Sequence, residues 1–260
     1  MTLSADKIEE LSAFAADLAT AAAEVSLKYF RAPMDIDNKL GDDGFDPVTR
    51  ADQGAEEAIR AVIEAKYPDH AIIGEEFGVK DTGSPFEWVL DPIDGTRAFI
   101  SGLPTWGTLI GLKHEGVPLV GVIDQPYLGE RYVGWTTGAT LNGKPIKTRP
   151  CKSLGTATLS TTDADLFDPE DRAHFDAILK QVQLVRYGLD CYAYAILASG
   201  FMDVIMETGL ETYDMMALIP VVRGAGGSAT CWSGDAPGES GKLLAAGDEE
   251  LAQTILAQIN

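Results

Sequence analysis

The stretch from Trp88 to Phe99 (Trp-Val-Leu-Asp-Pro-Ile-Asp-Gly-Thr-Arg-Ala-Phe) constrains the fold of this chain more than any other. Its apolar start predicts a buried strand, and Asp91 leaves that strand. Pro92 has no N–H donor, so we expect it to end the ladder and turn the chain, which places Asp91 and Asp94 close together. Two neighbouring carboxylates repel each other, and one takes up a proton unless a cation lies between them.

The residues that follow offer groups of the opposite kind. Gly95 lets a ligand approach the backbone closely. Thr96 supplies a hydroxyl, and a short helix is expected to begin there with free N–H groups that suit an anion. Carboxylates for a hard divalent metal beside donors for a phosphate predict a metal-dependent phosphate site.

The composition excludes several classes of partner. A formal net charge of −20 argues against binding to nucleic acid or to an anionic membrane. No apolar run approaches the roughly 20 residues of a membrane span, and the N-terminus lacks the pattern of a signal peptide. The three cysteines are widely separated, which suits a reducing compartment, so we expect a cytoplasmic location. Bound metal ions would supply the positive charge that a phosphate ligand needs in so acidic a chain.

Periodicity predicts an α/β chain in two parts. Helices are expected at 4–29, 50–67, 169–180, 191–198, 213–223 and 249–259, and strands at 71–74, 106–112, 119–124, 130–135, 156–160, 183–187 and 202–207. Asn142-Gly143 predicts a hairpin in an antiparallel meander. The stretch 149–155 is the expected boundary between an N-terminal α+β half (1–150), with the metal-binding motifs, and a C-terminal α/β half (151–260), with the substrate-specificity residues and Asp214.

Several further carboxylates have both an ordinary and a functional interpretation. Glu75 and Glu76 follow a strand, and adjacent residues in extended chain point opposite ways, so one of them can enter a site. Asp190 could be a plain helix N-cap, Glu207 a solvent-facing strand end and Asp214 a partner of a helix dipole.

Taken together, these motifs resemble the inositol monophosphatase family. The motifs are Asp46-Pro47-Val48-Thr49-x-Ala51-Asp52, Gly74-Glu75-Glu76, Trp88 to Thr96, and Tyr213-Asp214 followed by a helix and Gly226-Gly227. They span nearly the whole chain in the family's order. The resemblance implies a layered α/β/α/β/α sandwich, a homodimer, and hydrolysis of phosphomonoesters with two or three Mg²⁺ ions per site.

The resemblance also implies roles for individual residues. The implied metal ligands are Glu75, Asp91, the carbonyl of Ile93, Asp94 and Asp214. Thr96 and Glu75 would orient the attacking water, and Asp46 would support it through Thr49 or a further metal site. The backbone N–H groups of Gly95 and Thr96 would hold the phosphate.

Two local sequences resemble the histidinol-phosphate phosphatase branch of that family, Arg186 to Tyr194 and Asp94 to Gly102 with the following Trp106 to Ile110. Asp190 stands where inositol phosphatases have a small residue. Carboxylates at Asp190 and Glu207 suit a substrate with a cationic amine. The implied substrate residues are Gly95, Thr96, Arg186, Gly188, Leu189, Asp190 and Glu207, and the expected substrate is L-histidinol phosphate.

Other functions remain open at this point. Within the same family, the alternatives are an inositol-1-monophosphatase and a phosphatase of broad specificity for sugar or nucleotide phosphates. A non-catalytic metal-binding interaction protein on the same scaffold is a third. A haloacid-dehalogenase-like phosphatase is excluded because two residues, not one, separate Asp91 from Asp94. An EF-hand is excluded because Gly102 stands where its final glutamate belongs.

Overall fold

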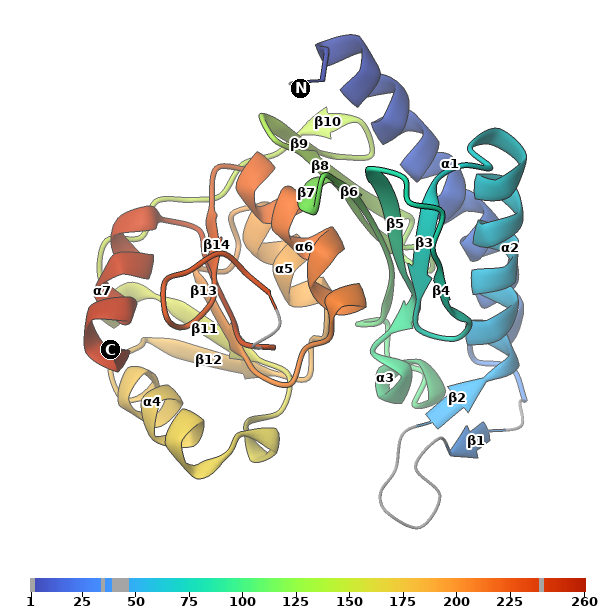
Figure 1. The fold of residues 1–260 in the computed structure, drawn as a ribbon. Helices are drawn as coiled ribbons and strands as arrows, with labels where there is room; N and C mark the ends of the chain where they lie inside the picture. The colour runs from blue at the N-terminus through green and yellow to red at the C-terminus, as the bar shows by residue number, and fades with distance from the viewer. Residues whose placement is uncertain (1–2, 34–35, 39–46, 239–240) are drawn as a thin grey trace.

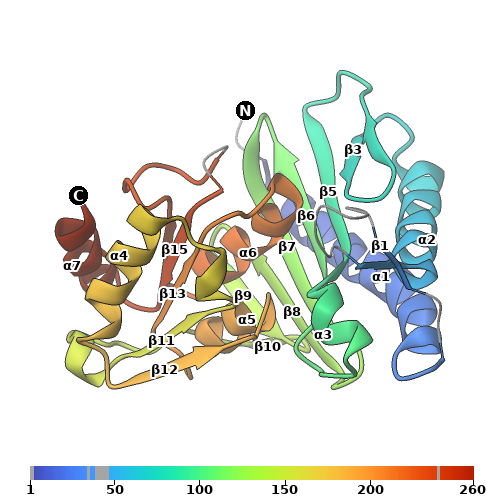
Figure 2. The same cartoon turned by 90° about the horizontal axis from the view of Figure 1, so that it is seen from below.

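Helices and sheets alternate in five layers in the computed structural model of the chain, which describes residues 3–33, 36–38, 47–238 and 241–260. Helices α1 (Ala5–Tyr29) and α2 (Arg50–Lys66) cover the outer face of a large sheet. Helices α5 (Tyr192–Ala198) and α6 (Thr212–Gly224) lie between it and a small sheet, and α4 (Pro169–Leu179) and α7 (Glu249–Ile259) cover the far side (Figures 1 and 2). The predicted α/β/α/β/α sandwich is confirmed.

Within the described residues, the strands form one large sheet, one small sheet and a separate pair. The large sheet has the order β10-β9-β8-β7-β6-β5-β3-β4, from Lys144–Pro145, Gly138–Leu141, Glu130–Trp135, Val117–Gln125, Gly107–His114, Phe86–Asp94, Ala71–Gly74 and Gly78–Lys80. The small sheet has the order β12-β11-β13-β15-β14, from Leu184–Tyr187, Thr158–Thr161, Val204–Glu207, Leu243–Ala246 and Ser228–Thr230. The pair consists of β1 (Ile36–Asn38) and β2 (Pro47–Thr49). Short helices at Thr96–Ile100 (α3), Leu154–Thr156 (η2) and Ala164–Leu166 (η3) complete the fold.

Local sequence explains many of these boundaries. The Ser4 hydroxyl accepts a hydrogen bond from Lys7 N at the start of α1, and Asp168 caps α4 in the same way. The meander from β5 to β10 is antiparallel, as expected. Its last turn has φ of 50° at Asn142 and 76° at Gly143, the conformation that favours Asn-Gly.

No helix among the described residues has the length and apolar character that crossing a membrane requires.

Strand β5 corrects one expectation. Pro92 does not end the ladder, because β5 continues through it and Asp94 pairs with Gly107 after a register shift. A bulge accommodates a residue without an N–H and redirects the side chains around it. The Thr108 hydroxyl donates to the Pro92 carbonyl across this irregularity (2.8 Å). Asp91 and Asp94 therefore lie on one strand, at its bulge.

A row of glycines seats α6 on the large sheet. Gly111, Gly121 and Gly134 face one another across β6, β7 and β8. A Cβ at Gly121 would lie 2.0 Å from the carbonyl oxygen of Ala217, and one at Gly134 would lie 2.3 Å from Val221 Cα. Only glycine permits so close an approach of the helix backbone. The row thus fixes where α6 lies, and α6 carries Asp214 in its first turn.

Candidate active site

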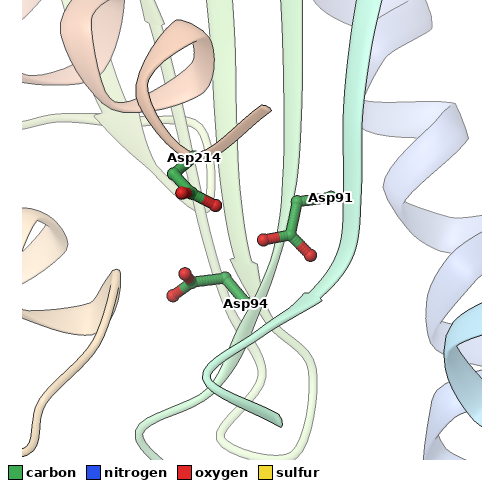
Figure 3. A group of neighbouring side chains, drawn as sticks. All are labelled: Asp91, Asp94 and Asp214. Carbon is green, nitrogen blue, oxygen red and sulfur yellow. The ribbon is translucent and has the colours of Figure 1, made fainter. Parts of the chain in front are cut away.

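Three aspartates from two distant parts of the chain form an acidic cluster. Asp91 and Asp94 come from the bulge of β5, and Asp214 comes from the start of α6. One carboxylate oxygen of each lies within 4.8 Å of the others, and Figure 3 shows the three side chains grouped around one space. Asp91 is buried, whereas Asp94 and Asp214 are partly exposed. Oxygen ligands at this spacing are what a Mg²⁺ ion binds.

The cluster is electrostatically strained without a cation. Burial raises the pKa of Asp91 well above its ordinary value, and the nearby Glu75, Asp94 and Asp214 raise it further. Burial, reinforced by Asp214, raises the pKa of Asp94 to about 7. Burial is also the main reason that the pKa of Asp214 rises to about 7. Like charges in a poorly hydrated site resist ionisation together, so a divalent cation would restore the charged form.

Backbone donors hold two of the cluster's carboxylates in place. Cys191 N donates to Asp94 Oδ2 (2.7 Å) and Glu211 N donates to Asp214 Oδ2 (2.7 Å). Asp214 is therefore part of a capping box at α6, so the helix-terminus interpretation of this residue holds alongside its place in the cluster. Each bond leaves carboxylate lone pairs for a further partner.

The groups expected beside the cluster lie there. Glu75 follows β3, and its carboxyl is close enough to Asp91 to bond it and raise its pKa. The Thr96 hydroxyl donates to the Ile93 carbonyl (3.1 Å), which leaves the hydroxyl oxygen free to accept a bond from a water. Gly95 has φ of 80° and stands at the N-cap of α3, where the first N–H groups have no partner within the helix.

A second pair of carboxylates lies next to this cluster. Burial raises the pKa of Asp190 to about 8, with Asp94 and Glu207 adding to the effect, and burial also raises the pKa of Glu207. Asp190 packs so tightly on Gly95 that a Cβ there would lie 2.8 Å from Asp190 Cγ. Cys191, not Asp190, takes the N-cap position of α5, so the plain-cap interpretation of Asp190 is wrong.

Two cavities connect the acidic groups. One, of about 150 Å³, is lined by Asp94, Asp190, Glu207 and Asp214 among others. The other, of about 440 Å³, is lined by Gly95, Thr96, Arg97, Gly188 and Asp190 among others. A larger hollow, of about 1150 Å³, lies between α1 and β7–β9 and includes no member of the acidic cluster. Chemistry therefore points to the two smaller cavities, since one is lined by Asp94 and Asp214 of the acidic cluster and the other combines Asp190 with the start of α3.

Comparison with known proteins identifies this arrangement. The profile of the inositol monophosphatase family matches residues 7–260. The chain belongs to the inositol monophosphatase family. An inositol monophosphatase from Zymomonas mobilis, whose structure is solved, is 42% identical, with 99% of each chain covered and a TM-score of 0.88.

Two curated relatives in this family carry other names. The chloroplastic bifunctional phosphatase IMPL2 of Arabidopsis thaliana is 45% identical over 99% of this chain and 77% of its own length. A histidinol-phosphatase of Chlorobaculum parvum is 36% identical over 94% of this chain and 95% of its own. The family resemblance expected from the motifs is confirmed, and the names of the relatives leave the substrate open.

Some predicted site residues of this inositol monophosphatase family member lie away from the cavities. Arg186 is exposed and lines neither of them, and its carbonyl accepts from Ser160 Oγ (3.2 Å). Leu189 packs against the apolar core between the sheets. Asp46 and the side chain of Thr49 lie outside the described residues. Their predicted roles stay predictions.

The predicted substrate residues Glu207 and Asp190 are bonded by residues that the motif analysis missed. Glu207, which the sequence allowed to face solvent, is buried, and Oε1 accepts from both Thr162 N (3.0 Å) and the Thr162 hydroxyl (2.5 Å). Tyr194 OH donates to Glu207 Oε2 (2.9 Å), and the Thr105 hydroxyl lies 3.4 Å from Asp190 Oδ2. These contacts join residues 13 to 85 positions apart. Tyr194 stands within the branch motif, but no local signal marks Thr105 or Thr162.

Proposed function

We propose that this family member is a Mg²⁺-dependent phosphomonoesterase whose substrate is L-histidinol phosphate. The substrate assignment depends on the pair Asp190 and Glu207, two carboxylates that line the cavity beside the acidic cluster; Glu207 is buried and Asp190 is partly buried. Buried carboxylates beyond the metal ligands favour a cationic substrate over a neutral polyol, because a cation compensates their lost hydration. A histidinol-phosphatase among the relatives supports the same assignment.

The donor set fits Mg²⁺. Asp91, Asp94, Asp214 and Glu75 would hold two or three ions together with the carbonyl of Ile93, which has a second lone pair beside the bond from Thr96. All of these donors are oxygens, and three of them already converge. Bound Mg²⁺ supplies a more acidic water and neutralises the charge that develops on the leaving oxygen.

The chain's own groups position the reactants. Glu75 and the Thr96 hydroxyl accept hydrogen bonds from the attacking water and hold it in line with the phosphorus, with Asp46 and Thr49 as their expected support. The backbone N–H groups of Gly95 and Thr96 bind the phosphoryl oxygens at the start of α3. Phosphoryl transfer depends mainly on such positioning and on charge stabilisation, so no nucleophilic side chain is required.

Asp190 and Glu207 divide the recognition of the amine. Oε1 of Glu207 already accepts two bonds from Thr162, and Oε2 accepts one from Tyr194. Asp190 accepts one long bond, from Thr105, so it has more capacity for an ammonium group. Asp190 also touches Gly95, which places the amine-binding carboxylate against the phosphate-binding backbone. A short amino-alcohol phosphate can reach both.

A substrate comparison tests the proposal. Phosphate release from L-histidinol phosphate should require Mg²⁺, disappear with EDTA and exceed release from inositol 1-phosphate. Higher turnover of inositol 1-phosphate would favour the second candidate, an inositol-1-monophosphatase, which the name of the Zymomonas mobilis protein supports. Comparable rates on several sugar or nucleotide phosphates would indicate broad specificity. Binding of Mg²⁺ without hydrolysis of any ester would leave a non-catalytic interaction protein.

Further parts of the proposal concern the molecule as a whole. A homodimer and a cytoplasmic location are proposed from family resemblance and composition. The net charge of −20 supports a small-molecule substrate and argues against nucleic acid and membranes as partners. The division into a metal-binding half (1–150) and a specificity half (151–260) is likewise a proposal, in which Asp214 crosses from the second half to complete the site of the first.

A further inference from the structure

Glu56, in the middle of α2, is a charged side chain for which the proposed mechanism has no use. Its side chain is fully buried beneath the large sheet's edge strands. Burying a carboxylate is unfavourable unless bonds and charges compensate it, and replacing such groups by apolar ones is often neutral. The partners of Glu56 therefore indicate what its charge holds in place.

Glu56 and Arg60 hold the turn between β3 and β4. Glu56 Oε2 accepts from Glu76 N (2.8 Å) and Oε1 accepts from Phe77 N (3.2 Å). Arg60, one helical turn further on, donates through Nε to Glu56 Oε1 (2.7 Å) and through its other end to the carbonyl of Gly78. Glu56 and Arg60 together thus bond two N–H groups, of Glu76 and Phe77, and one carbonyl, of Gly78, in the same short turn.

That turn begins with Glu75, the carboxylate proposed to bind metal and orient water. Glu75 N donates to the Leu90 carbonyl of β5 (3.2 Å), one residue before Asp91. Its carboxyl contacts that of Asp91. Since the backbone on either side of Glu75 is held, the position of its Cα and the direction of its Cα–Cβ bond are fixed relative to Asp91.

Gly74 shows how closely Glu56 is fitted to this turn. A Cβ on Gly74, the last residue of β3, would lie 1.9 Å from Glu56 Oε1 and 2.4 Å from its Cδ. Any side chain at position 74 would displace the Glu56 carboxylate. The absence of a side chain at Gly74 therefore leaves the space that the Glu56 carboxylate needs to bond the turn.

We propose that Glu56 is a positioning residue for Glu75, acting through the Glu75–Phe77 turn and neutralised by Arg60. A carboxylate is required because all of its neighbours are donors, two backbone N–H groups and a guanidinium. An amide at position 56 would direct its own N–H groups at one of them. This inference rests on the proposed role of Glu75, and it adds a residue that never touches substrate or metal.

The test compares Glu56→Gln with the wild type in the full-length protein. Phosphate release is measured against Mg²⁺ concentration at saturating substrate, and KM is measured at saturating Mg²⁺. Outer partners of metal ligands typically alter metal affinity by 10- to 100-fold, so the half-saturating Mg²⁺ concentration should rise by roughly 10-fold or more, with KM little changed. Asp203→Asn is the matched control, because Asp203 is also buried, pairs with Arg149 and accepts from Thr158 N. It should lower thermal stability and leave the Mg²⁺ dependence unchanged.

Further variants keep the inference testable. Gly74→Ala should also raise the half-saturating Mg²⁺ concentration. The double variant Glu56→Ala with Gly74→Ala should raise it no further than Glu56→Ala alone, because the new Cβ at position 74 then has no Glu56 carboxylate to displace. Arg60→Lys should give a smaller shift in the same direction and serves if the other variants do not fold.

Two results would overturn the inference: a wild-type Mg²⁺ dependence for Glu56→Gln, or an equal shift for Asp203→Asn. Should the wild type hydrolyse no ester, the proposed function fails. The increase of Tm with Mg²⁺, compared between wild type and Glu56→Gln, then still tests the positioning of Glu75. An equal increase in the two proteins would contradict it.

Discussion

Asp203 and Asp91 are both buried aspartates, yet they have opposite electrostatics. Asp203 is bonded by the Arg149 guanidinium and by Thr158 N, and these partners hold its pKa below the ordinary value despite its burial. Asp91 faces Glu75, Asp94 and Asp214, and its pKa is raised well above the ordinary value. The region around Asp203 includes a compensating cation, Arg149, whereas the region around Asp91 contains only further carboxylates among the groups that shift its pKa.

The difference separates structural carboxylates from ligand-binding ones. A carboxylate paired with an arginine is complete within the fold, so its removal leaves an unpaired charge. A carboxylate among other carboxylates destabilises the fold through charge repulsion, and binding of a cation compensates that repulsion. Stability and function should therefore respond in opposite ways to mutation in the two regions.

The largest expected effect is on activity in the acidic cluster. Asp91→Asn removes one charge from the proposed metal site with little change in shape, so phosphate release should fall by more than about 100-fold. The same variant should raise the Tm of the metal-free protein, since it removes repulsion among buried carboxylates. Steady-state assays and thermal melts in EDTA check both parts. A metal-free protein made less stable by Asp91→Asn would contradict the comparison.

Asp203→Asn should behave in the opposite way. It leaves Arg149 without its partner and weakens the bond to Thr158 N, at a cost of about 2 kcal/mol in the free energy of unfolding. Denaturant unfolding measures this loss. Turnover under saturating Mg²⁺ at a temperature where the variant stays folded should be within about twofold of wild type; a large loss of turnover would mean that the two regions are coupled.

The pH dependence of stability should reveal the cluster when metal is absent. Asp94 and Asp214 have folded-state pKa values raised to about 7, so their stabilising contribution is present at acid pH and is lost as pH rises through about 7. The metal-free protein should lose on the order of 5 kcal/mol between pH 5 and pH 8, about half from each carboxyl. Saturating Mg²⁺ should flatten this slope. Unfolding curves at several pH values, with Mg²⁺ or EDTA, measure it, and equal slopes in both would count against a metal site.

The smallest effect concerns substrate choice. Asp190→Asn should lower kcat/KM for L-histidinol phosphate by roughly 10-fold, because the ammonium loses a charged acceptor. The same variant should change kcat/KM for inositol 1-phosphate much less. Parallel assays of the two esters decide the matter. An equal loss on both would assign Asp190 a supporting role for the Gly95 loop in place of amine recognition.

Sequence reasoning succeeded where the signal is local. The helix predicted over 4–29, the helix start predicted at 169 and the Asn142-Gly143 hairpin depend on neighbours a few residues apart, and the structure has all three. Family motifs likewise indicated that Asp214 would join Asp91, although the two are 123 positions apart in the sequence. Their meeting depends on the glycine row under α6, which pattern analysis did not single out.

It was less successful where tertiary contacts decide. Pro92 was expected to end β5, but a bulge supported by Thr108 carries the strand past it. Asp190 was compatible with a helix cap, and the structure instead packs it on Gly95. Glu56 stands in a helical pattern that predicts only an amphipathic helix, so its bonds to a turn twenty residues later carry no sequence signal.

The most direct test of this account is a calorimetric titration of Mg²⁺ into metal-free protein near pH 6, in two buffers of different ionisation enthalpy. Mg²⁺ should bind with release of protons, because Asp94 and Asp214 with pKa values of about 7 must ionise to bind it, and Asp94→Asn should remove most of this binding. Absence of Mg²⁺ binding to the wild type, or binding that Asp94→Asn leaves unchanged, would contradict it.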